Sequence, residues 1–194
     1  MKGRLGNSRE KIIDAAEQVV LQEGARHLTL DAVASRSGVS RGGLLYHFPG
    51  KEALLKGMLD RLRSRMAESM ARKRAGIPAG PAREAVVFVR SAFDEGNDRK
   101  KGVTAAVLAS GAHDPKLLAP VREDFRRYLQ DLTREGLGFE RAAVIFLATN
   151  GMKFLETFSM SPFDERERRD IIAALQELAG EGASPGKETH PAGE

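Results

Sequence analysis

The chain has 194 residues, of which 41% are hydrophobic, a net charge of +4 and no cysteine. The lack of cysteine excludes a disulfide framework and a thiolate metal site, and it suits a reducing compartment. The first residues lack the apolar segment of a signal peptide, and the longest apolar run, 142–148, is far shorter than the ~20 residues that span a bilayer. We therefore expect a cytoplasmic protein without a membrane segment.

Positive charge is concentrated in the N-terminal part of the chain. Residues 1–75 contain 15 Lys or Arg and 8 Asp or Glu, a net charge of +7, whereas residues 76–194 have a net charge of −3. Such an imbalance favours a phosphate-rich partner. Basic residues also occur on ordinary solvated surfaces, so this distribution is informative only beside a binding motif.

Three helices are predicted before residue 50. Residues 9–23 carry an apolar stripe at helical spacing. Thr29 is a good N-cap for a short second helix that ends at Gly38, and Ser40 caps a third helix that Pro49 stops. Two short helices joined by a glycine turn are typical of a helix-turn-helix, whose second helix enters the major groove of DNA.

The helix that follows Ser40 has two different faces. Leu44, Leu45 and Phe48 share one side, which we expect to pack against the preceding helix. Adjacent glycines cost a helix roughly 1 kcal/mol each relative to alanine, so Gly42 and Gly43 indicate close approach to a partner. Tight packing inside the protein is the alternative explanation for the two glycines.

The opposite face predicts specific contacts with DNA. Arg41 can donate two hydrogen bonds to guanine O6 and N7. Lys51 opens the next helix, where its ammonium and the N-terminal amides can face one phosphate. The capping hydroxyls can add phosphate contacts at their own helix starts. The predicted DNA-binding residues are Thr29, Ser40, Arg41, Gly42, Gly43, Tyr46, His47 and Lys51.

The rest of the chain also predicts helices and shows no strand alternation. Gly111 is expected to end one of them, and Pro120 to restart or kink another. The tail, 181–194, mixes Gly, Pro, Ser and charge and is expected to be disordered. The predicted helices are 51–75, 82–95, 103–110, 114–135, 139–159 and 164–179.

No residue pattern indicates catalysis or metal binding. Gly50 and Lys51 lack the glycine spacing and the preceding strand of a phosphate-binding loop. The four histidines have no ligand spacing, and no serine has the strand-turn-helix setting of a hydrolase. We expect no enzyme activity, no metal and no cofactor.

The segment from Val39 to Leu54, VSRGGLLYHFPGKEAL, resembles the signature of the tetracycline repressor (TetR) family of bacterial regulators. The resemblance extends back through residues 8–16, and covers the remainder only in helical architecture and length. One position departs from the family pattern. Many members have a tyrosine in place of Leu45 that commonly contacts a DNA phosphate, whereas here the tyrosine is Tyr46.

The resemblance implies an all-α homodimeric repressor that binds a palindromic operator in double-stranded DNA and is released by a small, mostly apolar effector. The three-helix helix-turn-helix domain would span 1–50, and a helical bundle for effector binding and dimerisation would span 51–180, followed by the tail. In this family the body helices enclose the effector pocket. The candidate pocket residues, each of which could instead be ordinary core, are Phe88, Leu108, His113, Phe125, Asn150 and Phe154.

Dimerisation is also expected from apolar patterning. Residues 139–159 have too many apolar faces for a helix covered on one side. The last helix adds apolar residues at helical spacing, so paired helices from two subunits would form a four-helix interface. The added residues are Ile171, Ile172, Leu175 and Leu178. The alternative function is a helical ligand-binding or protein-interaction module with a vestigial helix-turn-helix.

Overall fold

The computed structural model describes residues 2–80, 82–94, 101–134 and 136–180, and every regular element in these ranges is helical. None of the helices in these ranges is long and apolar enough to cross a membrane. The predicted tail, 181–194, lies outside the described residues. The elements are α1 (Lys2–Glu23), the 3-10 helix η1 (Ala25–His27), α2 (Leu30–Ser37), α3 (Arg41–His47), α4 (Lys51–Ala75), α5 (Arg83–Ala92), α6 (Lys101–His113), α7 (Ala119–Arg134), α8 (Phe139–Thr157) and α9 (Glu165–Gly180).

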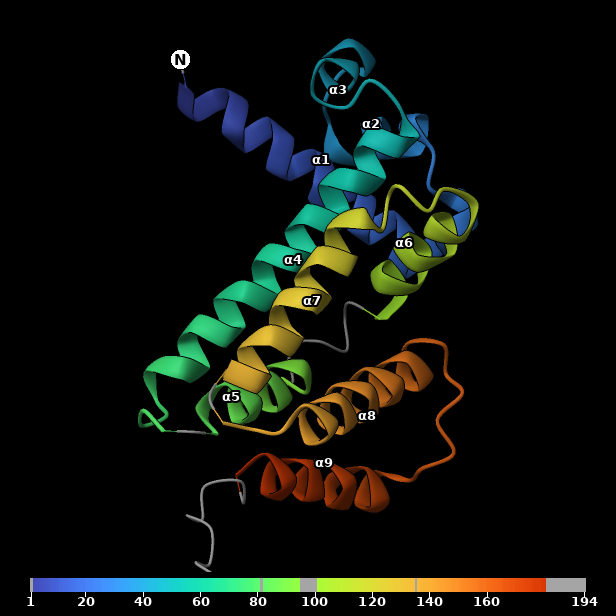
Figure 1. Cartoon of the computed structure of the whole chain (residues 1–194). Coiled ribbons are helices and arrows are strands. Elements are labelled where there is room, and N and C mark those ends of the chain that lie inside the picture. Colours follow the sequence, from blue (N-terminus) through green and yellow to red (C-terminus); the bar gives the residue numbers. More distant parts are fainter. Residues whose placement is uncertain (1, 81, 95–100, 135, 181–194) are drawn as a thin grey trace, which may run out of the picture.

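The helices form two regions joined by one long helix. Figure 1 shows α1, α2 and α3 gathered at one end of the molecule and α8 and α9 stacked at the opposite end. The 25-residue helix α4 runs from the first group along the length of the molecule. We call α1–α3 the head and α5–α9 the body.

The helix-turn-helix forms as its capping residues predict. The Thr29 Oγ1 accepts a hydrogen bond from the N–H of Ala32 at 3.1 Å, and the Ser40 Oγ accepts one from the N–H of Gly43 at 3.2 Å. Between the two helices, Gly38 has φ of 66°, a left-handed conformation that favours glycine. Local sequence thus fixes the start of both helices and the turn between them.

The first hydrophobic core lies where the head meets the first half of α4. It also includes α6, although α6 comes from the body in chain order. Burial of these side chains removes apolar surface from water and holds α3 against α1, α4 and the rest of the head. The buried members include Ile12, Ile13, Val19, Val33, Leu44, Phe48, Leu54, Met58, Val103 and Val107.

The second hydrophobic core belongs to the body. It lies between the second half of α4 and helices α5, α7, α8 and α9. Leu175 is buried in this core, and Ile171 and Leu178 pack against it. Part of the apolar stripe of α9 is therefore used within the subunit, whereas Ile172 is not a member of this core. The expected four-helix interface with a second subunit stays a prediction. The buried members include Met70, Val87, Phe88, Val89, Leu132, Ala142, Ile145 and Leu175.

Of two predicted interruptions, Gly111 has a different role from the one expected, whereas Pro120 restarts the chain as expected. The helix α6 continues through Gly111, where a Cβ would lie 2.4 Å from the Leu118 Cγ. Glycine is required there for close packing and does not end the helix. Pro120 is the second residue of α7, where no intrahelical N–H bond is needed, so it begins the helix without kinking it. The helix α1 also begins earlier than expected, at Lys2.

Candidate DNA-binding surface and effector cavity

The recognition helix α3 is anchored by its apolar side. Leu44 and Phe48 are buried in the first core, as the sequence predicts. Leu45 is 37% exposed, so its predicted packing role is wrong. Tyr46, with 75% of its surface exposed, and Leu45 both face away from the core. The outer side of α3 therefore offers an apolar and an aromatic side chain in addition to its polar groups.

Arg41 is exposed at the first turn of α3 and paired within the head. Its guanidinium donates a hydrogen bond to the carboxylate of Asp31 on α2. The side chains of Arg41 and Asp31 are 61% and 71% exposed. Exposed ion pairs contribute about 0–1 kcal/mol, so Arg41 can exchange Asp31 for a base or a phosphate at small cost.

The two glycines of α3 lie in different surroundings. A Cβ on Gly43 would lie 3.0 Å from the Val39 Cγ1 and 3.2 Å from the Ser40 Oγ, so tight packing within the protein accounts for this glycine. A Cβ on Gly42 would have no neighbour within 4 Å. Of the two glycines, only Gly42 leaves open space on the outer side of α3. Close approach of the α3 backbone to DNA is therefore expected at Gly42.

The predicted DNA-binding residues lie in one region of the chain, at the start of α2, on α3 and at the start of α4. Thr29, Ser40 and Lys51 are exposed, like Arg41 and Gly42. His47 is half-buried, and its ring meets the Tyr46 ring edge-on with 5.2 Å between centroids. None of the predicted DNA-binding residues is fully buried, so their side chains or backbone remain accessible to a partner.

A group of ion pairs, which sequence reasoning missed, fixes α1 to α4. The Arg61 guanidinium, on α4, donates to the carboxylates of Glu10 and Asp14 and, at 3.0 Å, to the backbone carbonyl of Glu10. Arg65 donates to both carboxylate oxygens of Glu17 at 3.0 and 3.1 Å. The acids have helical spacing in the sequence, but their partners come from a helix about fifty positions later in the chain.

The Arg61 guanidinium stays charged in this setting. Burial by itself would lower its pKa, but hydrogen bonds to Glu10 and Asp14 and the charge of Glu17 raise the pKa above its ordinary value. The arginine thus holds three acids of α1 against α4. This group links α4 directly to the head.

A cavity of about 530 Å³ lies between α8 on one side and α4, α6 and α7 on the other. Its volume is in the range of small-molecule sites, about 300–1,000 Å³. Most of its wall is apolar. The apolar lining comes from Leu59, Leu62, Met66, Val107, Leu108, Val121, Phe125, Leu147 and Phe154, and the polar lining from Arg63, Thr104, Asp124, Tyr128, Asn150, Lys153 and Thr157.

Four of the six predicted pocket residues line this cavity, namely Leu108, Phe125, Asn150 and Phe154. Phe88 does not line the cavity. It is buried in the second core, where the centroids of its ring and the Tyr128 ring are 5.7 Å apart. His113 is exposed at the end of α6, away from the cavity lining. These two placements correct the predicted pocket.

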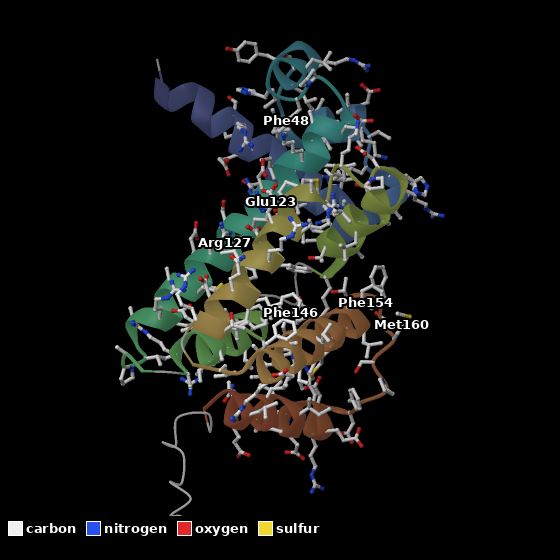
Figure 2. The ribbon with its side chains drawn as sticks, in the orientation of Figure 1. Phe48, Glu123, Arg127, Phe146, Phe154 and Met160 are labelled. Carbon is white, nitrogen blue, oxygen red and sulfur yellow. The ribbon has the colours of Figure 1, made fainter. Side chains whose placement is uncertain are left out.

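A charged pair in the cavity wall could not be found from the sequence. Asp124 of α7 is buried and accepts two hydrogen bonds from Arg63 of α4, one of 3.1 Å from Nη2, and a further bond from Arg127. The hydrogen bond with Asp124 raises the pKa of the Arg63 guanidinium above its ordinary value. Figure 2 shows Arg127 on α7, beside the second half of α4. Sixty-one positions separate Arg63 from Asp124, so local patterning contains no signal for the pair.

A second charged group lies at the far end of α8. The buried Glu156 accepts a hydrogen bond of 2.8 Å from Arg168 of α9 and one of 3.3 Å from Lys153. Burial alone would raise the pKa of the Glu156 carboxyl, but the bonds and charges of Arg168 and Lys153 outweigh it and lower the pKa below its ordinary value. Glu156 is therefore ionised at neutral pH and ties α8 to α9.

Several apolar side chains of α8 and of the segment after it are exposed, and two of them, Leu147 and Phe154, also line the cavity. Val144 is 54% exposed and Leu147 is 67% exposed. Phe154 and Met160 are also exposed, and Figure 2 shows both toward the end of α8 that lies away from Phe146. An apolar face of this kind marks a surface for association.

Comparisons with known proteins agree with this architecture. Residues 12–58 match the model for bacterial regulatory proteins of the tetR family, and residues 82–180, just over half of the chain, match the tetracyclin repressor-like C-terminal domain. The HTH-type transcriptional regulator BetI of Escherichia coli K12 is 26% identical over 177 residues, 84% of this chain and 89% of that protein.

Solved structures show the same fold. The crystal structure of a transcriptional regulator from Rhodococcus sp. Rha1 superimposes with a TM-score of 0.73 at 23% identity and covers 92% of this chain and 99% of its own. The SmeT–triclosan complex superimposes with a TM-score of 0.66 at 19% identity and covers 97% of this chain and 100% of its own. With both family models matched in chain order, this chain belongs to the tetracycline repressor (TetR) family of bacterial regulatory proteins.

Proposed function

We propose that this protein is a transcriptional repressor that binds a palindromic operator in double-stranded DNA as a homodimer, in the bacterial cytoplasm. The observation that carries the proposal is the outer side of α3. It exposes Arg41, Gly42 and Tyr46 while Leu44 and Phe48 anchor the helix in the first core. A rigidly held helix with one exposed polar side suits insertion into the major groove.

The chain divides by role into a DNA-binding domain at 1–50 and an effector-binding and dimerisation domain at 51–180. Two helices connect the cavity with the core of the head. Leu59 and Leu62 of α4 line the cavity, while Leu54 of the same helix is buried in the core that it shares with the head. Val107 of α6 takes part in both, because it lines the cavity and is buried in that core.

The cavity is the proposed effector site. A small, mostly apolar molecule that fills it displaces side chains of α4 and α6 and so changes how the head is held. The operator is released only if the effector binds better to the arrangement that does not fit DNA, because equal affinity shifts no population. The neighbour SmeT, which was solved with triclosan, supports a ligand role for a body of this fold.

The proposed dimer forms through α8. Exposed apolar residues of α8 that do not line the cavity, such as Val144, would be buried against the same face of a second subunit, which gives a symmetric interface. The two heads would then reach successive major grooves on one side of the DNA. Sedimentation should show a dimer at nanomolar protein, and a monomer at micromolar protein would contradict this assembly.

The decisive test is selection of bound fragments from the source genome with the purified full-length protein. We expect a palindromic sequence to be enriched and its binding to weaken as salt is added, because phosphate contacts release counterions. Failure to enrich any fragment, or binding that is insensitive to salt, would favour the alternative, a helical ligand-binding or protein-interaction module with a vestigial helix-turn-helix.

The effector role is tested separately from DNA binding. Phe154→Ala and Asn150→Ala alter the cavity lining far from the head, so operator affinity should stay nearly intact while the effector concentration needed for release changes. If operator affinity and thermal stability decreased together in these two variants, Phe154 and Asn150 would have only a structural role.

A further inference from the structure

Three polar residues of α8 form a row along the cavity. Lys153 lies three positions after Asn150 and four before Thr157, so the three side chains share one side of the helix. All three line the cavity. A lysine thus lies between an asparagine and a threonine on an otherwise mostly apolar wall.

The charge of Lys153 is only partly compensated by its partner. Among the described residues, its Nζ donates one hydrogen bond, to the Glu156 Oε2 at 3.3 Å, and lies over the Phe93 ring at 5.7 Å from its centroid. Glu156 is shared, because its Oε1 accepts the shorter bond of 2.8 Å from Arg168. An ammonium has three N–H donors, so Lys153 has capacity to bind a further acceptor. Its side chain is 22% exposed and forms part of the cavity lining.

The acid in the cavity lining does not favour a cationic ligand. Asp124 is the one carboxylate among the described lining residues, and Arg63 and Arg127 occupy both of its oxygens. A ligand cation would therefore meet Lys153 and Arg63 without an available acid. An anionic group would meet an ammonium with spare donors, and charge-assisted hydrogen bonds of this kind are the stronger ones.

We infer that the cavity takes an amphipathic monocarboxylate, with the carboxylate on Lys153 and an apolar chain against α4 and α6. Asn150 and Thr157 add hydrogen bonds to the carboxylate on either side. The chain lies against Leu59, Leu62 and Leu108, which supply the apolar wall opposite α8. This inference rests on the proposed effector role of the cavity and names the chemical class that it recognises.

The test compares three probes with the same ten-carbon chain and different heads: decanoate, decanol and decyltrimethylammonium. Each is titrated below its micelle concentration into the full-length protein by calorimetry. Decanoate should bind about tenfold more tightly than decanol, a difference of about 1.4 kcal/mol, and the cation should bind most weakly. The ratio of the two Kd values within one variant is insensitive to a general loss of folded protein.

Two variants assign the preference to Lys153. Lys153→Gln should abolish the preference for decanoate and leave the Kd of decanol within about twofold. Lys116→Gln removes an exposed lysine before α7 that does not line the cavity, so it should retain the preference. Asn150→Asp places a carboxylate one turn before Lys153 and should weaken decanoate while strengthening the cationic probe.

Each contrary result has a distinct meaning. Equal affinity for decanoate and decanol would overturn the carboxylate inference and leave the proposed apolar effector site in place. A preference that survives in Lys153→Gln would overturn the assignment to this lysine. If no probe binds while operator DNA is still bound, both the inference and the effector role of the cavity are overturned, and the DNA-binding function stands.

Discussion

The head and the body of this protein form their candidate sites in opposite ways. The DNA-binding surface comes from one short segment, 29–51, and its polar side chains project into solvent. The cavity is assembled from four helices, and its charged groups, Asp124 and Lys153, are held by partners on the cavity wall or beside it. A site made by one segment is visible in the sequence, whereas a site made by several helices depends on how they pack.

The two regions are nevertheless mechanically connected. The body helix α6 contributes Val103 and Val107 to the core of the head, and a Cβ on Gly102 would lie 3.3 Å from the Leu21 Cδ2 of α1. Arg61 ties α4 to α1 from another side. The head therefore has contacts with two of the four helices that wall the cavity, which would give the proposed effector two routes to the candidate DNA-binding surface.

The largest expected effect is a difference in stability between variants of two aromatic residues near the end of α3. Phe48 is buried and a Cβ on Gly57 of α4 would lie 2.7 Å from its ring, whereas Tyr46 is exposed. Phe48→Ala should lower the free energy of unfolding by about 3–5 kcal/mol. Tyr46→Ala should change it by no more than about 0.5 kcal/mol and reduce operator affinity. Denaturant unfolding of both variants checks this, and equal stabilities would contradict the packing described for α3.

The second prediction tests the charged group between α8 and α9. Glu156→Gln should lower the free energy of unfolding at pH 7 by about 1.5–3 kcal/mol, because Arg168 and Lys153 lose a charged acceptor. Glu140→Gln, an exposed acid on the same helix, is the control and should have little effect. Operator affinity per folded protein should be unchanged, since the head is distant.

The same acid gives a pH dependence. Its pKa is below the ordinary value of 4.5 in the folded protein, so its contribution to stability is present above that pH and is lost as the pH falls through the folded pKa. The difference in stability between wild type and Glu156→Gln should therefore shrink below pH 4.5. A difference that stays constant over that interval would show that the carboxylate is not the group responsible.

The third prediction concerns base recognition by the head. Arg41→Ala should weaken operator binding by about 1–3 kcal/mol and relax sequence preference at one position in each half-site. Arg166→Ala, which removes the same charge from an exposed position on α9, is the matched control. If Arg41→Ala still discriminates fully between operator and scrambled DNA, Arg41 does not read a base.

The smallest expected effect is a change of salt dependence. Lys51→Ala should weaken binding to specific and random DNA alike and lower the slope of log affinity against log salt by roughly one unit per subunit. Affinity titrations over a range of salt concentrations measure this slope. An unchanged slope would mean that Lys51 serves only to begin α4.

Features that depend on residues a few positions apart could be predicted from the sequence, whereas features that depend on distant residues could not. Thr29 and Ser40 were predicted as caps because a cap bonds an N–H three positions away, and the structure confirms both. Leu45 was misassigned because helical spacing alone does not decide how much of a face the neighbouring helix covers. The sequence predicts a helix end at Gly111, and this is wrong because its packing partner, Leu118, lies beyond the helix and leaves no local signal.

By itself, the sequence determined the all-helical class, the helix-turn-helix and the family, because these depend on caps, turns and apolar spacing within a few residues. Tertiary structure alone decided that α6 packs on the head, that Leu175 of α9 is buried within the subunit, and that Lys153 and Asp124 line a cavity whereas His113 does not. Those outcomes depend on contacts between helices dozens of positions apart, and such contacts are set by how the buried apolar faces fit together.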